Sequence, residues 1–104
     1  MEDDKLYQQP NLNLNEVAQV LRCNPKQLSK LINEEFDQNF SDYINQYRIE
    51  EVKQKLHLKE YEHYTILAIA MDAGFNSKSS FNAVFKKSTG LTPSAFRASQ
   101  TFNN

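Results

Sequence analysis

The chain of 104 residues contains little that would support a β-sheet, a disulfide framework or a membrane anchor. Two glycines and three prolines leave few positions for hairpin turns, and no stretch alternates apolar and polar residues as a strand does. The single cysteine, Cys23, cannot form an intrachain disulfide. No apolar run could span a bilayer, and the acidic start MEDDKLYQQP is unlike a signal peptide. These absences predict one all-α domain that works in the cytoplasm and makes no membrane contact.

Residue groupings that catalysis or metal binding would require are also missing. His57 and His63 have no cysteine or carboxylate cluster near them at metal-ligand spacing. No Ser/His/Asp grouping and no glycine-rich phosphate loop occurs in the sequence. We therefore expect no enzyme activity, no metal and no cofactor.

Charge is segregated along the chain, although the net charge is only −1. Residues 17–33 and 73–104 contain bases and no acid, whereas residues 34–62 contain more acids than bases. The bases of the two blocks are Arg22, Lys26, Lys30, Lys78, Lys86, Lys87 and Arg97. Two basic blocks are thus separated by an acidic one, and such an asymmetry bears on the partners of the protein rather than on its fold.

Apolar residues recur at helical spacing in several segments, and capping residues precede them. The first segment would bury Leu14, Val17, Ala18 and Leu21, and the second would bury Leu28, Leu31 and Ile32. Ser41 is the expected cap of a longer helix, which would end near Leu58. The pattern predicts helices at about residues 13–22, 25–36, 41–58, 65–73, 78–89 and 92–97, with flexible tails at residues 1–11 and 99–104.

One structural unit occurs twice in the sequence. A shift of 52 residues places the apolar face of residues 14–21 on that of residues 66–73, and a shift of 53 places Asn24 on Ser77 and Leu28 on Phe81. Each copy is a helix, a short turn and a capped second helix, which is the form of a helix-turn-helix. The repeat predicts two helix-turn-helix subdomains, about residues 13–36 and 65–89, joined by a long linker helix at about residues 41–58.

The second helix of such a unit carries side chains that reach base edges near its N-terminal end. Lysine can donate to guanine, and glutamine or asparagine can pair with adenine. The first unit offers Lys26, Gln27, Ser29 and Lys30, and the second offers Lys78, Ser79, Ser80 and Asn82. Asn24, Ser77 and Ser80 lie at helix N-termini, where free N–H groups favour phosphate.

The linker helix sets the expected distance between the two units. A helix of about 16 residues is ~24 Å long. With the bodies of the two units added, it could hold two reading helices ~34 Å apart, which is one turn of the duplex. Both helices could then enter successive major grooves, at a site that need not be palindromic.

The segment IAMDAGFNSKSSFNAVFKKSTGLTPSAFR resembles the second helix-turn-helix of AraC/XylS-type bacterial transcription regulators. The matching positions are Ile69, Ala70, Gly74, Phe75, Ser77, Ser79, Phe81, Phe85, Lys86, Gly90, Thr92, Pro93, Phe96 and Arg97. The segments LNEVAQVLRCNPKQLSKLINEEF and FSDYINQYRIEEV resemble the first motif and linker of that family. Residues 12–98 are thus identified as an AraC-type DNA-binding domain.

This resemblance implies about seven helices and binding to double-stranded promoter or operator DNA. It implies base contacts from Lys26, Ser29, Lys30, Lys78, Ser79 and Asn82. It implies phosphate contacts from Asn24, Ser77, Lys86, Lys87 and the helix start at Thr92–Ser94. Arg48 matches the family's linker-helix arginine, for which we expect a structural role or a contact with the DNA backbone.

Several positions depart from the family pattern. Arg22 and Asp37 stand where glycine is common, Val52 replaces an alanine, and Ala83 replaces a frequent arginine of the second reading helix. Family members usually carry a preceding sensing or dimerisation domain, and RNA polymerase is a further candidate partner. The competing interpretation is a helical protein-docking module without DNA binding, which would use the acidic residues 34–62 to bind a basic protein surface.

Overall fold

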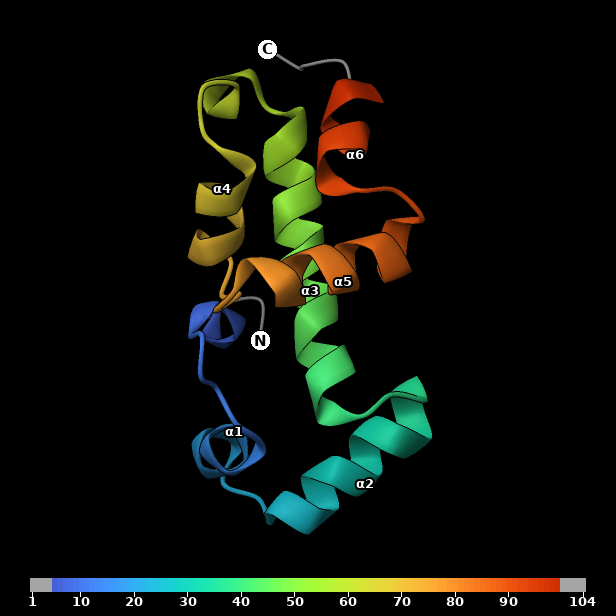
Figure 1. The fold of residues 1–104 in the computed structure, drawn as a ribbon. Helices are drawn as coiled ribbons and strands as arrows, with labels where there is room; N and C mark the ends of the chain where they lie inside the picture. Colours follow the sequence, from blue (N-terminus) through green and yellow to red (C-terminus); the bar gives the residue numbers. More distant parts are fainter. Residues whose placement is uncertain (1–4, 100–104) are drawn as a thin grey trace.

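The computed structural model describes residues 5–99, and over these residues it is all-α (Figure 1). Six α-helices and two short 3-10 helices follow one another in the described part, where about seven helices were expected. They are η1 (Leu6–Gln8), α1 (Leu14–Leu21), α2 (Pro25–Phe36), α3 (Phe40–His57), η2 (Lys59–Tyr61), α4 (Ile66–Asp72), α5 (Lys78–Thr89) and α6 (Pro93–Ser99). None of these helices has the length and apolar character needed to cross a membrane.

Asparagine side chains set where the helices of the first half begin. Asn13 Oδ1 accepts the N–H of Glu16 at 2.9 Å, and Asn24 Oδ1 accepts that of Lys26 at 2.8 Å. The linker helix α3 begins one residue before Ser41, because Asn39 Oδ1 accepts the N–H of Asp42 at 2.8 Å and is the actual cap. The expectation that Ser41 caps this helix was therefore wrong.

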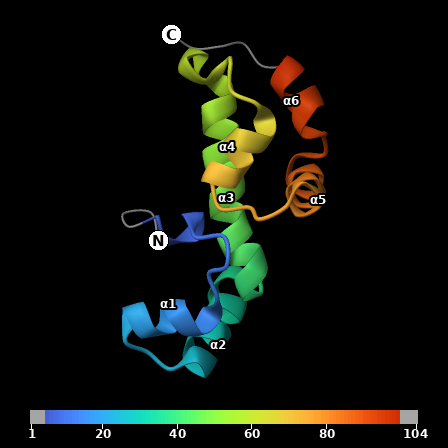
Figure 2. The same ribbon diagram turned by 60° about the vertical axis from the view of Figure 1, so that its left-hand side comes forward.

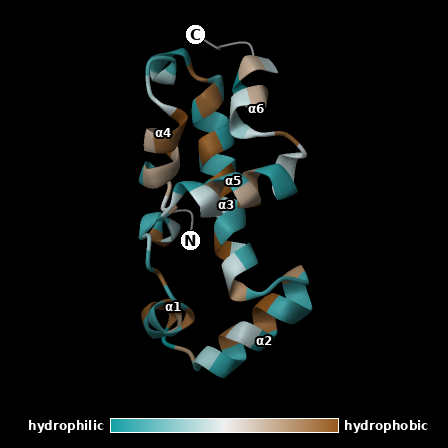
Figure 3. Ribbon diagram, in the orientation of Figure 1, coloured by the Kyte–Doolittle hydropathy of each residue, from teal (hydrophilic) through white to brown (hydrophobic). Residues whose placement is uncertain are grey.

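Two separate hydrophobic cores lie along α3, which joins the halves of an elongated molecule of 42 × 24 × 23 Å (Figure 2). Apolar residues recur along the whole of α3, as its alternating colours show (Figure 3). The first core contains Val17, Ala18, Leu28 and Ile32. The second contains Ile49, Val52, Leu56, Ile69, Ala70, Ala73, Phe75, Phe81 and Phe85.

Two residues expected in the first core lie outside it. Leu21 is 57% exposed and Leu31 is 52% exposed. Leu21 is the last residue of the eight-residue helix α1, and the core of this subdomain gathers around Val17 and Ala18, further from the helix end. The spacing of apolar residues identified the helix but overestimated the width of its buried face.

Left-handed backbone closes both helices of the first unit. Arg22 has φ 58° and Asp37 has φ 52°, at the positions where the family pattern has glycine. In the second unit Gly90 ends α5 with φ 78°, and its N–H donates to the carbonyl of Lys86 at 2.8 Å. The two non-glycine residues keep the same turn geometry at a cost of about 1–2 kcal/mol each, partly relieved for Asp37 by its short polar side chain.

The expectation of a flexible tail over residues 1–11 was wrong for its described part. Residues 5–11 are ordered, and Tyr7 in η1 is only 6% exposed. Its hydroxyl donates to Glu51 Oε1 at 2.8 Å, across 44 positions of sequence. Of the expected C-terminal tail, Ser99 belongs to α6, and residues 100–104, like residues 1–4, lie outside the described range.

Candidate nucleic-acid interface

The N-terminal half of α2 presents a row of polar side chains to solvent. Lys26, Gln27 and Lys30 are exposed and Ser29 is half-buried. Leu28 on the opposite face is 7% exposed and packs in the first core. One face of the helix is therefore anchored, and the other is free to meet a partner.

Lys30 is held only weakly within the protein. Its Nζ lies 3.9 Å from Glu34 Oε1, with side chains 75% and 62% exposed, respectively. Such a solvent-exposed pair contributes about 0–1 kcal/mol. Lys30 could therefore leave Glu34 and bind a phosphate or a base with little loss of free energy.

Helix α5 repeats this arrangement in the second unit. Ser77 Oγ accepts the N–H of Ser80 at 3.1 Å, which fixes the helix start. The residues that follow on the outer face, Lys78, Ser79, Ser80 and Asn82, are all exposed. Phe81 stands between them on the inner face, with its ring centroid 5.2 Å from that of Phe75. The three phenylalanines of this segment are core residues, as their spacing indicated.

A hollow of about 400 Å³ opens between α4, α5 and α6. Its apolar lining consists of Ile66 and Leu67 of α4, Phe81 of α5 and Pro93 of α6. Five residues predicted to contact DNA line it together: Lys78, Asn82, Lys86, Thr92 and Ser94. None of the lining residues is acidic, so the hollow favours an anionic occupant. Ile66 and Leu67 were not foreseen at this site, because their place beside α5 depends on how α4 and α5 both pack on α3.

Three predicted phosphate ligands act as helix caps. Asn24 and Ser77 cap α2 and α5, and Thr92 Oγ1 accepts the N–H of Ala95 at 3.2 Å at the start of α6. Each cap uses its oxygen as an acceptor, and the amide N–H groups of Asn24 and the hydroxyl hydrogens of Ser77 and Thr92 are separate donors. A cap can therefore hold its helix and still donate to a phosphate oxygen.

Lys86 and Lys87 face different hollows. Lys86 lines the one beside α6, whereas Lys87 lines a second hollow of about 320 Å³ between the two subdomains. Asp37 and Asp42 also line this second hollow. The structure thus separates two lysines that sequence reasoning had treated alike, and it places Lys87 near carboxylates.

Arg48 lies inside the fold. It is 9% exposed, and burial lowers the pKa of its guanidinium from the ordinary value. Nε donates to the carbonyl of Tyr7 at 2.7 Å, Nη2 to the carbonyl of Gln9 at 2.9 Å, and Nη1 to Asn45 Oδ1 at 3.1 Å. Of the two roles expected for Arg48, these contacts favour the structural one over a contact with the DNA backbone, because the donors of its guanidinium are turned toward carbonyl groups inside the protein.

The described part of the chain contains no candidate metal-binding site. There, no three His, Cys, Asp or Glu side chains come together as a metal site requires. Cys23 is a free, half-buried thiol in the turn after α1.

Comparison with known proteins shows to which family the chain is related. The family model of a helix-turn-helix domain matches residues 17–99. The chain is 38% identical over 93 residues to an uncharacterized transcriptional regulatory protein, YesN, of Bacillus subtilis, with 88% of the chain and 25% of YesN covered. An uncharacterized HTH-type transcriptional regulator of Staphylococcus aureus strain MSSA476 is 33% identical, with 89% of the chain and 12% of the relative covered. The chain thus spans about a quarter or less of the length of these relatives.

Solved structures show the same architecture. The C-terminal domain of AraT, a response regulator from Geobacillus stearothermophilus, superposes with a TM-score of 0.81 at 28% identity, covering 96% of this chain and 80% of that one. The C-terminal domain of the two-component response regulator yesN from Fusobacterium nucleatum gives a TM-score of 0.69 at 30% identity, covering 90% and 88%. Both matches cover nine tenths or more of this chain.

Proposed function

Because the chain belongs to the AraC-type helix-turn-helix family of bacterial transcription regulators, we propose that it reads one DNA duplex with α2 and α5 in successive major grooves. It would act as the sequence-specific output domain of such a regulator. The observation that carries this proposal is the repeated geometry of the two helices: each is buried on one face and exposes donors beside a capped N-terminus.

Base reading would come from Lys26, Gln27, Ser29 and Lys30 of α2 and from Lys78, Ser79 and Asn82 of α5. All are exposed except the half-buried Ser29, and none is needed to hold the core. Ala83 is also exposed on α5, and its methyl group can offer only an apolar contact. We therefore expect α2 to contribute more hydrogen-bonded base specificity than α5.

Phosphate contacts would position the domain on the duplex. Asn24, Ser77, Ser80, Thr92 and Ser94 supply amide or hydroxyl donors near helix starts, and Lys86 and Lys87 supply charge. The hollow beside α6 brings Lys86, Thr92 and Ser94 together, which supports one phosphate path along that side. Lys87 would reach a phosphate only from the flank between the subdomains.

The dimensions of the molecule support a bipartite interaction. Helix α3 has 18 residues, and a helix of that length is about 27 Å long. The long axis of 42 Å exceeds the spacing of about 34 Å between successive major grooves on one face of the duplex.

The lengths of the relatives bear on the partners of this domain. Since the chain covers 25% of YesN and 12% of the staphylococcal relative, we propose that a sensing or dimerisation domain lies elsewhere in the full regulator. RNA polymerase is a further proposed partner, and the bacterial cytoplasm is the proposed location, because the target DNA is there. The family is one of transcription regulators, and we propose no catalytic role for this domain.

The test begins with selection of bound duplexes from a random pool. We expect a site with two half-sites about one helical turn apart. On that site, log affinity should fall linearly as log salt rises. The Lys30→Ala variant should lose about 1–3 kcal/mol and relax base preference at one position, whereas Lys86→Ala should weaken all sequences alike.

Lys59→Ala serves as the matched control, because Lys59 is exposed in η2 and was not predicted to touch DNA. It should leave affinity and the salt slope unchanged. If no sequence is enriched and affinity does not respond to salt, the proposal fails. The domain would then be a docking module that uses the acidic residues 34–62.

A further inference from the structure

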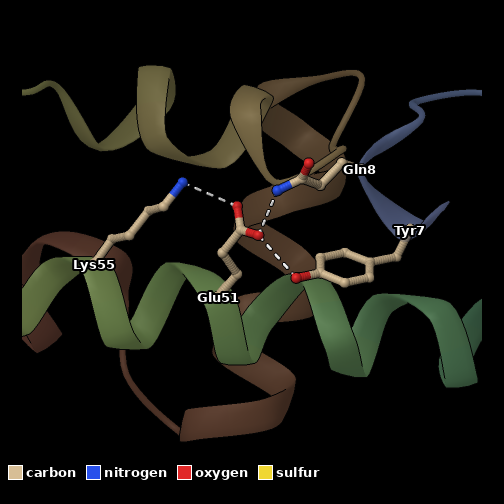
Figure 4. Close-up of polar contacts among 4 residues, drawn as sticks. All are labelled: Tyr7, Gln8, Glu51 and Lys55. Atoms are coloured by element: carbon tan, nitrogen blue, oxygen red, sulfur yellow. Dashed lines mark hydrogen bonds and ion pairs between the residues drawn. The ribbon is translucent and has the colours of Figure 1, made fainter. Parts of the chain in front are cut away.

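The segment of residues 5–12, which we name the strap, connects the first helix-turn-helix to the middle of α3. Leu12 at its end packs against the first core. At its start, Tyr7 and Gln8 donate to Glu51 Oε1 at 2.8 Å and 2.6 Å (Figure 4). Lys55 donates to the other oxygen of Glu51 at 3.1 Å, so one carboxylate gathers three donors. The strap is thus bonded to α3 well away from the point where α2 joins that helix.

Arg48 fixes the same strap through its main chain. Its guanidinium donates to the carbonyl groups of Tyr7 and Gln9, one on each side of Gln8. Main-chain carbonyls are present whatever the strap side chains are, so Arg48 holds the path of the strap rather than one particular residue.

The strap also packs closely against the second helix-turn-helix, at the turn between α4 and α5. A Cβ built on Gly74, in the turn between α4 and α5, would collide with the carbonyl oxygen of Tyr7 and lie 2.7 Å from Arg48 Nε. The guanidinium carbon of Arg48 lies 5.9 Å from the centre of the Phe75 ring. Arg48 therefore touches the strap, its own helix and the turn that precedes the second reading helix.

The two helix-turn-helix units do not pack tightly against each other where the end of α2 faces α5. The hollow of about 320 Å³ separates Asp37 and Gln38, after α2, from Val84 and Lys87 of α5. The two cores share no buried residue in the described chain. The relative placement of the units thus depends on α3 and on the strap that braces it.

We propose that Arg48 is a positioning residue for DNA binding: by clamping the strap against α3 and the α4–α5 turn, it fixes the spacing and phase at which α2 and α5 meet the duplex. This inference rests on the proposed reading of one duplex by both helices. Binding of the first helix makes binding of the second intramolecular, and the effective concentration is highest when the two are held at the matching distance. Loosening the strap would lower that concentration and at the same time widen the range of spacings that can be bound.

The test compares spacing dependence in wild type, Arg48→Lys and Tyr7→Phe. Arg48→Lys keeps the charge but loses the forked donors. Tyr7→Phe keeps the ring and removes the bond to Glu51, so it perturbs the strap without touching the guanidinium. Each is titrated against the selected duplex, the same duplex with one or two base pairs inserted between half-sites, and a duplex carrying one half-site. Circular dichroism confirms that the helix content of each variant matches that of wild type.

We expect the wild type to lose about tenfold or more in affinity on insertion, since each base pair rotates the second groove away from α5. Both variants should lose about threefold to tenfold on the uninterrupted site, lose less than the wild type on insertion, and bind the single half-site as the wild type does. A uniform loss on all three duplexes, or an unchanged insertion penalty in both variants, would overturn this inference alone. A wild type that binds the selected site but tolerates insertions would overturn the bipartite proposal and this inference with it.

Discussion

Arg97 in α6 donates through Nη2 to the carbonyl oxygen of Glu62 at 2.6 Å, across 35 positions of sequence. The same guanidinium donates to the carbonyls of Tyr61 at 2.9 Å and Tyr64 at 2.7 Å. One side chain thus ties the last helix to the connection between α3 and α4. Because Thr92 and Ser94 at the start of α6 line the hollow beside α5, this tie also holds one side of the candidate interface.

Arg97→Ala should lower the free energy of unfolding by about 1.5–3 kcal/mol, because three charge-assisted bonds are lost and two of them are partly buried. Arg97→Lys should recover less than half of this loss, since one ammonium group cannot reach all three carbonyls. Urea denaturation measures both. The exposed Lys59→Ala change is the control and should stay within about 0.5 kcal/mol of wild type. Equal stability of Arg97→Ala and wild type would contradict the tie.

Arg22→Gly should raise the free energy of unfolding by about 0.5–1 kcal/mol. The left-handed backbone at φ 58° costs Arg22 more than the entropy that glycine adds to the unfolded chain. The capping N–H of residue 22, which donates to Ala18 and Gln19, remains in the variant.

Gly90→Ala is the matched control for this backbone effect. Gly90 has φ 78°, and a Cβ there would meet nothing within 4 Å, so its substitution changes the backbone preference without a clash. It should destabilise by about 1 kcal/mol, the opposite sign to Arg22→Gly. The same sign of change in both variants would refute the argument from backbone conformation.

Glu34→Gln should raise affinity for DNA about twofold to fivefold at low salt, because it frees Lys30 and removes a negative charge beside the reading face. The gain should vanish as salt screens the pair. Electrophoretic or fluorescence titration at two salt concentrations measures it. Glu60→Gln in η2 removes a charge far along the chain from either reading helix, and it should change affinity less.

Glu51 should make stability depend on pH in acid. Burial alone would raise the pKa of Glu51, but the hydrogen bonds from Gln8, Tyr7 and Lys55, with the charge of Lys55, lower it below the ordinary value of 4.5. A lowered pKa means that the folded state binds its proton less readily than the unfolded state. The stabilisation is therefore complete above about pH 4.5 and is lost as pH falls through the folded-state pKa.

Glu51→Gln should remove this dependence. Its free energy of unfolding should lie below that of wild type near neutral pH, and the difference should shrink as pH is lowered toward about 3. Urea denaturation across this range measures the difference. A gap between the two proteins that stays constant or widens in acid would show that the carboxylate of Glu51 does not stabilise the fold.

The sequence alone predicted the features that depend on local patterns. The repeat identified both helix-turn-helix units, and Asn24 and Ser77 cap their second helices as expected. The resemblance to AraC/XylS-type regulators is confirmed by the family match over residues 17–99.

Features that depend on distant contacts were missed for a physical reason. A 3-10 helix of three residues is too short to show periodicity, so η1 was taken for part of a flexible tail. The burial of Tyr7 comes from Arg48 and Glu51, more than forty positions away. Leu31 shows the opposite error: its spacing suits a core, but it is 52% exposed.

The strap offers a point of attachment near the middle of the long axis of the molecule, where it is bonded to α3. The short helix η1 of the strap lies beside α3, between the two ends of the long axis (Figure 1). A fluorescent reporter or a mechanical tether joined to the strap would therefore be attached to the element that braces the two reading helices. A pull on that tether would load the contacts between the strap and α3 before it loaded α2 or α5.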